Sequence, residues 1–246
     1  MTKTRIEWAD AVWNPVTGCT PISPGCANCY ARAMARRLAG RCGYPADEPF
    51  RVTLHPERLE EPLRWRKPKR VFVGSMADIF HNEVTDEFLD RIFAVIALCP
   101  QHTFLILTKR PGRMWLYLSS AVRWPLPNVW LGVTAEGHHE AIERIPVLLR
   151  IPAAVRFVSV EPMLEPVDLF SVPINYGNGF FGDPFRPHHI PRSARDRAYN
   201  TLDWVICGCE TGPQARPMEV DWVRDLRDQC QEAGVPFFLK AMRVDG

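Results

Sequence analysis

Short apolar runs recur along the chain and alternate with stretches whose apolar residues fall at helical spacing. The runs are nearly continuous in hydrophobicity, which is typical of strands buried on both faces of a parallel sheet. They occupy residues 71–73, 104–107, 129–133, 155–160, 204–206 and 237–239, and a first strand is expected within residues 5–13. Successive runs mostly begin about 25–33 residues apart, which suits a strand followed by a crossover helix.

The stretches between the runs predict helices. Thr85 is expected to cap a helix whose first turn carries Asp86 and Glu87, which favour the positive end of the helix dipole. Further helices are expected over residues 30–38, 138–150 (interrupted at Pro146) and 221–232, and a short one from Pro111. Strands and helices in alternation predict an α/β fold with parallel strands, either a (β/α) barrel or an open sheet.

One interval is longer than the others. Residues 171–200 are rich in proline, glycine and arginine, and we expect them to form a surface loop or lid inserted into one domain that spans residues 1–246.

Composition narrows the function classes. The formal charge of +2 over 246 residues excludes a histone-like nucleic-acid binder, although local basic patches are compatible with it. No apolar run approaches the roughly 18–20 residues of a membrane span, and the first residues do not resemble a secretory signal. We therefore expect a cytoplasmic protein whose eight cysteines are reduced, so that they are metal ligands, catalytic groups or core residues.

Three of the eight cysteines are clustered. Cys19, Cys26 and Cys29 have the spacing C-x6-C-x2-C within a proline- and glycine-rich loop, residues 14–30, directly before the predicted helix 30–38. Three thiolates can hold three irons of a [4Fe–4S] cluster and leave the fourth open to another ligand. The alternatives are a zinc site, completed by Cys42 or His55, and plain core cysteines.

Several motifs occur together in one order along nearly the whole chain. They are the loop Trp13–Tyr30, Gly74-Ser75-Met76-Ala77-Asp78-Ile79-Phe80-His81, Leu107-Thr108-Lys109-Arg110-Pro111, Ser159-Val160-Glu161-Pro162 and Gly208-Cys209-Glu210-Thr211-Gly212-Pro213. With these motifs the chain resembles a phage-associated family of uncharacterised function that is known for a three-cysteine motif and is similar to radical S-adenosylmethionine (SAM) enzymes.

The resemblance implies a partial (β/α)6-type, TIM-like barrel, a [4Fe–4S] cluster on the three cysteines, and SAM. It further implies that SAM is cleaved to a 5′-deoxyadenosyl radical that acts on an unknown substrate, with an electron donor as a partner. Radical-SAM enzymes commonly use C-x3-C-x2-C with an aromatic residue before the last cysteine. Here the first gap is six residues and Asn28 precedes Cys29.

Polar residues follow the predicted strands, and barrel enzymes carry their chemistry at the carboxyl ends of strands. We therefore predict catalytic roles for Lys109, Glu161 and Glu210, with a solvated surface position as the alternative for each. The resemblance places Gly74, Ser75, Met76 and Asp78, and also Thr134 and Glu136, at the SAM site; a tight turn, a helix cap or a surface position is the structural alternative.

A second function remains open from the residues alone. The tract 64–70 carries five cations and one tryptophan, a combination suited to nucleic-acid phosphates and bases, and the insertion adds further arginines. The chain could thus be a zinc-binding, nucleic-acid-associated phage protein without catalysis, located in the host cytoplasm. A third possibility is a cluster-containing subunit that does not bind SAM and serves a partner protein.

Overall fold

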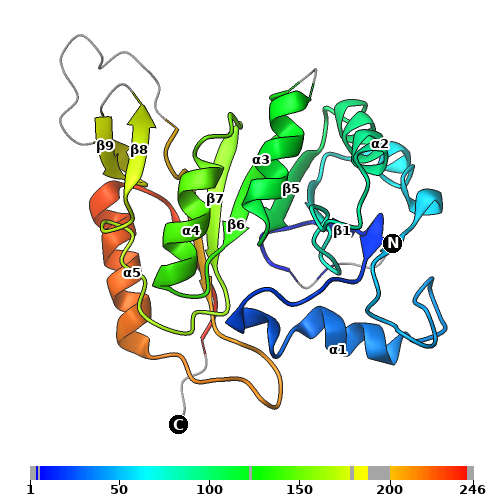
Figure 1. Ribbon diagram of the computed structural model, residues 1–246, viewed down its shortest axis with the longest axis horizontal. Coiled ribbons are helices and arrows are strands. Elements are labelled where there is room, and N and C mark those ends of the chain that lie inside the picture. Colours follow the sequence, from blue (N-terminus) through cyan, green and yellow to red (C-terminus); the bar gives the residue numbers. More distant parts are fainter. Residues whose placement is uncertain (1–3, 5, 122–123, 178–179, 188–199, 243–246) are drawn as a thin grey trace.

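Seven parallel strands form one sheet in the computed structural model, which describes residues 4, 6–121, 124–177, 180–187 and 200–242 (Figure 1). The sheet follows the chain order β1-β4-β5-β6-β7-β11-β12 and curves into a half-barrel. Its strands are β1 (Ala11–Trp13), β4 (Arg70–Val73), β5 (Thr103–Thr108), β6 (Val129–Thr134), β7 (Val155–Val160), β11 (Trp204–Gly208) and β12 (Phe237–Ala241). The strands predicted from hydrophobic runs are therefore confirmed, as is the mixed α/β class.

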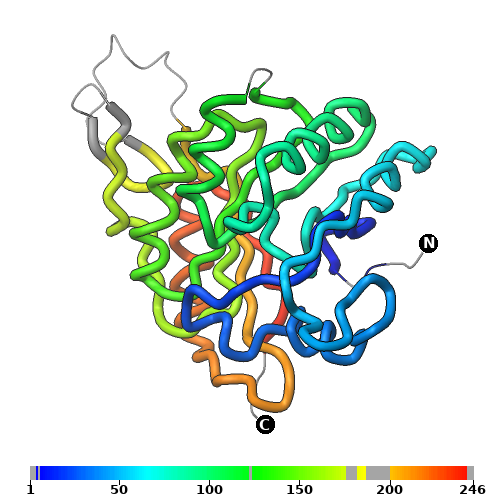
Figure 2. The backbone as a smooth tube through the Cα atoms, turned by 45° about the vertical axis from the view of Figure 1, so that its right-hand side comes forward, coloured from blue at the N-terminus to red at the C-terminus, as the bar shows by residue number. Residues whose placement is uncertain are grey.

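Helices connect these strands and cover the outer face of the sheet, with the exception of α1 (Figures 1 and 2). The α-helices are α1 (Tyr30–Arg37), α2 (Asp86–Ala97), α3 (Pro111–Ser120), α4 (His138–Leu148) and α5 (Val220–Ala233). Short 3₁₀ turns are η1 (Pro24–Cys26), η2 (Pro56–Arg58) and η3 (Pro62–Arg64), and β2 (Val16–Thr17) pairs with β3 (Thr53–Leu54).

The predicted helix ends agree with the structure at two positions and differ at one. The Thr85 side chain accepts a hydrogen bond from the Phe88 amide and caps α2, and Gly234 ends α5 in the left-handed conformation. The predicted interruption at Pro146 is wrong, because α4 continues through it to Leu148. Burial of Ile145 and Leu148 against the sheet holds the last turn in place despite the lost backbone hydrogen bond.

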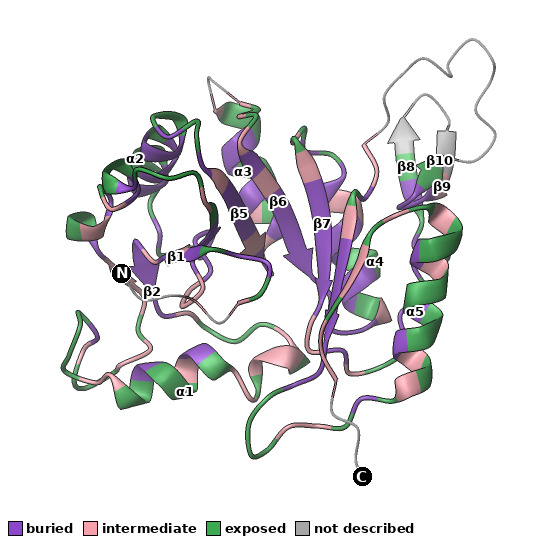
Figure 3. Ribbon diagram, turned by 180° about the vertical axis from the view of Figure 1, so that it is seen from behind, coloured by how far each residue is buried: buried purple, intermediate pink, exposed green. Residues whose placement is uncertain are grey.

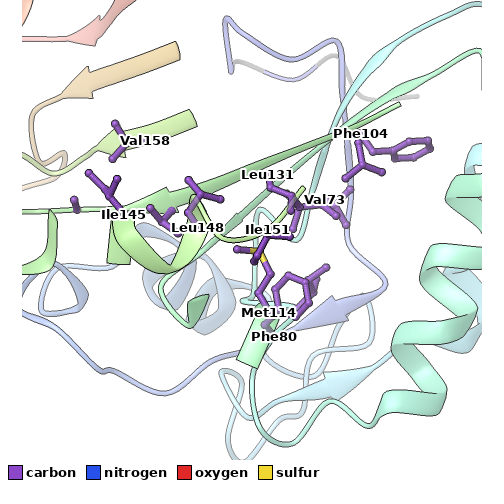
Figure 4. Close-up of a cluster of buried hydrophobic side chains, with 14 of the residues drawn as sticks. Val73, Phe80, Phe104, Met114, Leu131, Ile145, Leu148, Ile151 and Val158 are labelled. Atoms are coloured by element: carbon purple, nitrogen blue, oxygen red, sulfur yellow. The ribbon is translucent and has the colours of Figure 1, made fainter. Parts of the chain in front are cut away.

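Side chains of the sheet alternate between two cores, as the two-residue period of a strand requires. The outward set, which includes Val73, Phe104, Leu131 and Val158, packs against the helices (Figure 4). The inward set includes Phe72, Leu105, Phe157 and Ile206 and packs with Trp8 from the N-terminal segment. Trp204 stacks edge-to-face with both Trp8 and Trp130, so that aromatic rings fill the inner face.

The insertion contains regular structure that its composition did not predict. Strands β8 (Ile174–Gly177), β9 (Phe180–Asp183) and β10 (Arg186–Pro187) form a small antiparallel sheet. Ile174 and Phe185 are buried in the main core. Arg192, Arg195 and Arg197 lie outside the described residues.

The tract of basic residues 64–70 lies at the amino end of β4. Trp65 is buried and stacks on His102, so that its ring does not face solvent. Arg64 pairs with Glu60, and Arg70 pairs with Asp10. Trp65 is thus a core residue here rather than a base-stacking one.

None of the helices in the described part of the chain has the length and apolar character that a membrane span requires.

Candidate functional site

Charged side chains gather at the carboxyl ends of the strands, beyond the aromatic inner face. The two-residue period that points Leu105 and Leu107 inward continues to Lys109, and the same period carries Phe157 to Glu161. Trp204 and Ile206 lead in the same way to Glu210. The three residues predicted to be catalytic therefore follow strands in the inward register.

The cysteine loop is attached to this edge at the end of β4. Gly18 forms an isolated parallel bridge with Ala77, and its amide donates a 3.0 Å hydrogen bond to the Met76 carbonyl. The Asn14 carboxamide bonds the Ser75 hydroxyl and accepts from the Met76 amide at 3.1 Å. The Tyr30 hydroxyl donates to the Ser75 carbonyl. Residues 74–76 thus support the loop through their backbone and the Ser75 hydroxyl, and Gly74 turns the chain with φ +75°.

Cys19 lies beside a buried ion pair. The Arg110 guanidinium is 3.4 Å from the Cys19 sulfur and 3.1 Å from the Asp78 carboxylate. Asp78 also accepts hydrogen bonds from the Thr108 hydroxyl and the Lys109 amide, which orient it. Burial and the negative charge of Asp78 raise the pKa of the Cys19 thiol, although Arg110 acts in the opposite direction. Asp78 is therefore an orienting group for Arg110 and Cys19 in this structure.

The other two cysteines lie around the start of α1. Cys26 ends the η1 turn, and Cys29 is the N-cap residue of α1. Burial raises the pKa of Cys26, but polar backbone groups at Ile22 and Ser23 and the charge of Lys109 outweigh it, so that the pKa falls below its ordinary value. All three thiols are free and half-buried.

Among the described residues, no three side chains of His, Cys, Asp or Glu are placed so that they could hold a single metal ion. The two residues predicted as alternatives for a fourth zinc ligand differ in their surroundings. Both ring nitrogens of His55 have protein partners, Thr17 at 2.8 Å and Glu57 at 3.2 Å. Cys42 is exposed, and its carbonyl accepts a hydrogen bond from Arg58.

Glu136 connects the cysteine loop to the sheet. Its carboxylate is 1% exposed and pairs with Lys109 and, at 2.8 Å, with Arg144. The Ser23 hydroxyl of the loop donates to the same carboxylate at 2.5 Å. Gly25 packs so closely on Glu136 that any Cβ at position 25 would overlap the carboxylate. The position of the loop thus depends on this buried carboxylate.

The remaining predicted carboxylates also have basic partners. Lys240, within β12, pairs with Glu161. Arg216 pairs with Glu210 at 2.5 Å, and Asn28 of the cysteine loop donates to Glu210 at 2.9 Å. The side-chain hydrogen bonds of Arg216 are the main reason that the pKa of Glu210 falls to about 2.

We expect Glu210→Gln to destabilise the protein at neutral pH and to reduce its sensitivity to acid. A carboxyl whose folded-state pKa lies below its ordinary value of 4.5 contributes stability above that value and loses it as the pH falls toward about 2. The difference between wild type and variant should therefore be largest near neutral pH and should shrink below pH 4.5. Urea midpoints measured across this range test this; a constant difference contradicts it.

The structure thus places the predicted residues at one edge of the sheet, and it adds partners that the sequence did not single out. Asn14, Arg144, Arg216 and Lys240 belong to these networks. Lys240 directly follows a predicted strand, which is a usable signal, whereas Arg144 lies in the middle of a helix, where a cation ordinarily faces solvent. Thr134 contributes its backbone carbonyl, which accepts a 2.7 Å hydrogen bond from Arg144.

Comparison with known proteins gives one match. A family described as "Protein of unknown function (DUF5131)" matches residues 3–243. No curated protein and no solved structure matches the chain.

Proposed function

From the three-cysteine loop and the geometry of the site we propose that this chain, which belongs to the DUF5131 family, is an iron–sulfur enzyme of the radical-SAM type. Cys19, Cys26 and Cys29 hold a [4Fe–4S] cluster, and SAM and the substrate bind at the carboxyl edge of the half-barrel. The observation that carries this proposal is the placement of three free, half-buried thiols on one loop over that edge. The proposal includes a cytoplasmic location, of the host cell if the protein is phage-encoded.

The donor set fits such a cluster. Thiolates are the usual ligands of iron–sulfur clusters, and three of them leave one iron for an external ligand. Arg110 beside Cys19 and Lys109 near Cys26 place positive charge where a thiolate-bound cluster is negative. When bound, the cluster supplies one electron from an external donor to break the C5′–S bond of SAM, which gives methionine and a 5′-deoxyadenosyl radical.

The protein's own residues orient the reactants and exclude water. Arg110, held by Asp78, positions the Cys19 sulfur. Glu136 with Ser23, and Glu210 with Asn28, fasten the loop against the strand ends on two sides. Lys109, Glu161 and Lys240 supply charges along the same edge, where the ammonium, carboxylate and ribose hydroxyl groups of SAM require polar partners.

Anaerobic reconstitution with iron and sulfide tests the proposal. The wild type should bind iron and sulfide in equal amounts, and Cys19→Ala, Cys26→Ala and Cys29→Ala should each abolish this binding. Cys42→Ala is the matched control, because Cys42 is also a free thiol but lies outside the loop. With dithionite and SAM, the reconstituted wild type should release 5′-deoxyadenosine and methionine.

The alternatives give different results. Stoichiometric zinc in tetrahedral coordination with a fourth protein ligand would favour a zinc-binding, nucleic-acid-associated protein and contradict the enzyme. An intact cluster without cleavage of SAM would instead point to a subunit that serves a partner protein.

A further inference from the structure

Helix α1 has an unusual distribution of charge. No aspartate or glutamate occurs between Asp10 and Asp47, whereas four arginines do, all in α1 or the loop that follows it: Arg32, Arg36, Arg37 and Arg41. Arg36 and Arg37 are exposed, and among the described residues no carboxylate pairs with any of the four. Figure 3 shows the helix along one side of the molecule with a narrow buried stripe, which consists of Ala31 and Ala35.

Like charges lie close together on α1. Arg32 and Arg36 are four residues apart in the helix, and like charges at this spacing repel each other. Arg41 contacts the Arg37 carbonyl, and Arg32 lies over the Phe50 ring. Arg36 and Arg37 make no such side-chain contact among the described residues. Their charges are thus available to a polyanion.

Apolar surface borders the arginines. Tyr30 and Met34 are also four residues apart and lie beside Arg37 around the helix, whereas Arg36 lies about 100° further round, at the far edge of the exposed side. Tyr30 is 51% exposed and Met34 42%. The hydroxyl of Tyr30 is held by the Ser75 carbonyl at the strand ends, and Tyr30 directly follows Cys29. The solvent-exposed side of α1, which carries Tyr30, Met34, Arg36 and Arg37 and is here called the α1 face, meets the candidate site at Tyr30.

We propose that the α1 face binds single-stranded nucleic acid, with Arg36 and Arg37 on phosphates and Tyr30 and Met34 against unpaired bases. Positive charge interleaved with an exposed aromatic ring is the general chemistry of single-strand binding. The apolar part is only two side chains wide, which is narrower than the face that an interfacial helix lays into a membrane. That this nucleic acid is the substrate rests on the function proposed above; the binding surface does not.

Fluorescence anisotropy with a labelled single-stranded oligonucleotide, measured across a series of KCl concentrations, tests the proposal on the full chain. Arg36→Gln/Arg37→Gln should weaken binding. The slope of log affinity against log salt concentration should become smaller in magnitude by about 1.4, because each lost phosphate contact on a single strand contributes about 0.7. The matched control is Arg66→Gln/Lys67→Gln, which also removes two adjacent exposed cations but near the amino end of β4. The control should bind like the wild type.

The other outcomes are equally informative. Equal losses in both double variants, or no salt-dependent binding by the wild type, overturn the proposal. So does an equally tight complex with the duplex of the same sequence, or arginine-dependent binding to phosphatidylserine vesicles but not to the oligonucleotide. Thermal unfolding should show both variants folded, since neither loses a side-chain contact. Performed with and without the cluster, the titration separates failure of the α1 face from failure of the iron–sulfur site.

Discussion

Glu136→Ala is expected to lower the free energy of unfolding by about 3–5 kcal/mol, the cost of removing one partner from a buried ion pair. The substitution leaves Arg144, whose side chain is nearly as buried as that of Glu136, without its carboxylate. It also removes the acceptor of Lys109 and of the Ser23 hydroxyl. The cysteine loop loses a main attachment to the sheet at the same time. Urea unfolding at neutral pH measures the effect.

Two further variants make this result specific. Glu136→Gln keeps the size of the side chain and an acceptor for Ser23 but removes the charge, so that we expect a smaller loss than in Glu136→Ala. Glu143→Ala removes an exposed carboxylate that pairs with His139 on the same helix and should change stability by less than about 0.5 kcal/mol. A loss in Glu136→Ala no larger than in Glu143→Ala would show that the loop does not depend on this carboxylate.

Gly18→Ala should also be strongly damaging, with a loss of about 2–5 kcal/mol. Gly18 has φ +85°, a conformation that costs an L-residue about 1–2 kcal/mol. A Cβ at this position would also overlap the backbone of Phe50 and Arg51, which is overpacking that costs about 1–3 kcal/mol. Because the Gly18 amide bonds Met76, the substitution also displaces the loop beside Cys19.

Gly112→Ala is the control, and it is expected to raise the free energy of unfolding rather than lower it. Gly112 lies in helix α3, has ordinary helical geometry, and has nothing within 4 Å of the position of an added Cβ. Alanine there should stabilise the protein by about 0.5–1 kcal/mol, because it restricts the unfolded chain and favours the helix. Thermal midpoints that move in the same direction for both glycine variants would contradict the reasoning for Gly18.

The sheet could be predicted from the sequence because its strands are buried on both faces. The run 104–107, for example, contains no polar residue that would blur its limits, and the glycine after α5 marks the end of that helix. The interruption predicted at Pro146 is wrong because the burial of Ile145 and Leu148 against the sheet outweighs the local effect of proline on the backbone. Tertiary packing in this case outweighs a local preference.

The location of the candidate site could be predicted, but its internal pairing could not. Residues that follow strands must meet at one edge, which brings Lys109, Glu161 and Glu210 there. Which cation pairs with which carboxylate depends on loops whose paths have no sequence period. Arg216 reaches Glu210 across six residues of chain, and Arg144 reaches Glu136 from a helix. Nothing in the sequence indicates that position 25 requires a glycine, because the requirement comes from the close contact with Glu136 in the folded protein.

The aromatic rings inside the half-barrel have a spectroscopic consequence. The ring centroid of Trp204 lies 6.3 Å from that of Trp8 and 6.1 Å from that of Trp130, in edge-to-face contact. At these distances the indole transitions couple, and they should give a distinct near-ultraviolet circular dichroism band. The three rings belong to the inner face and not to the cysteine loop. Under the proposed function, a variant that keeps this band but fails to bind iron has released only its loop, whereas a variant that loses both has lost the sheet.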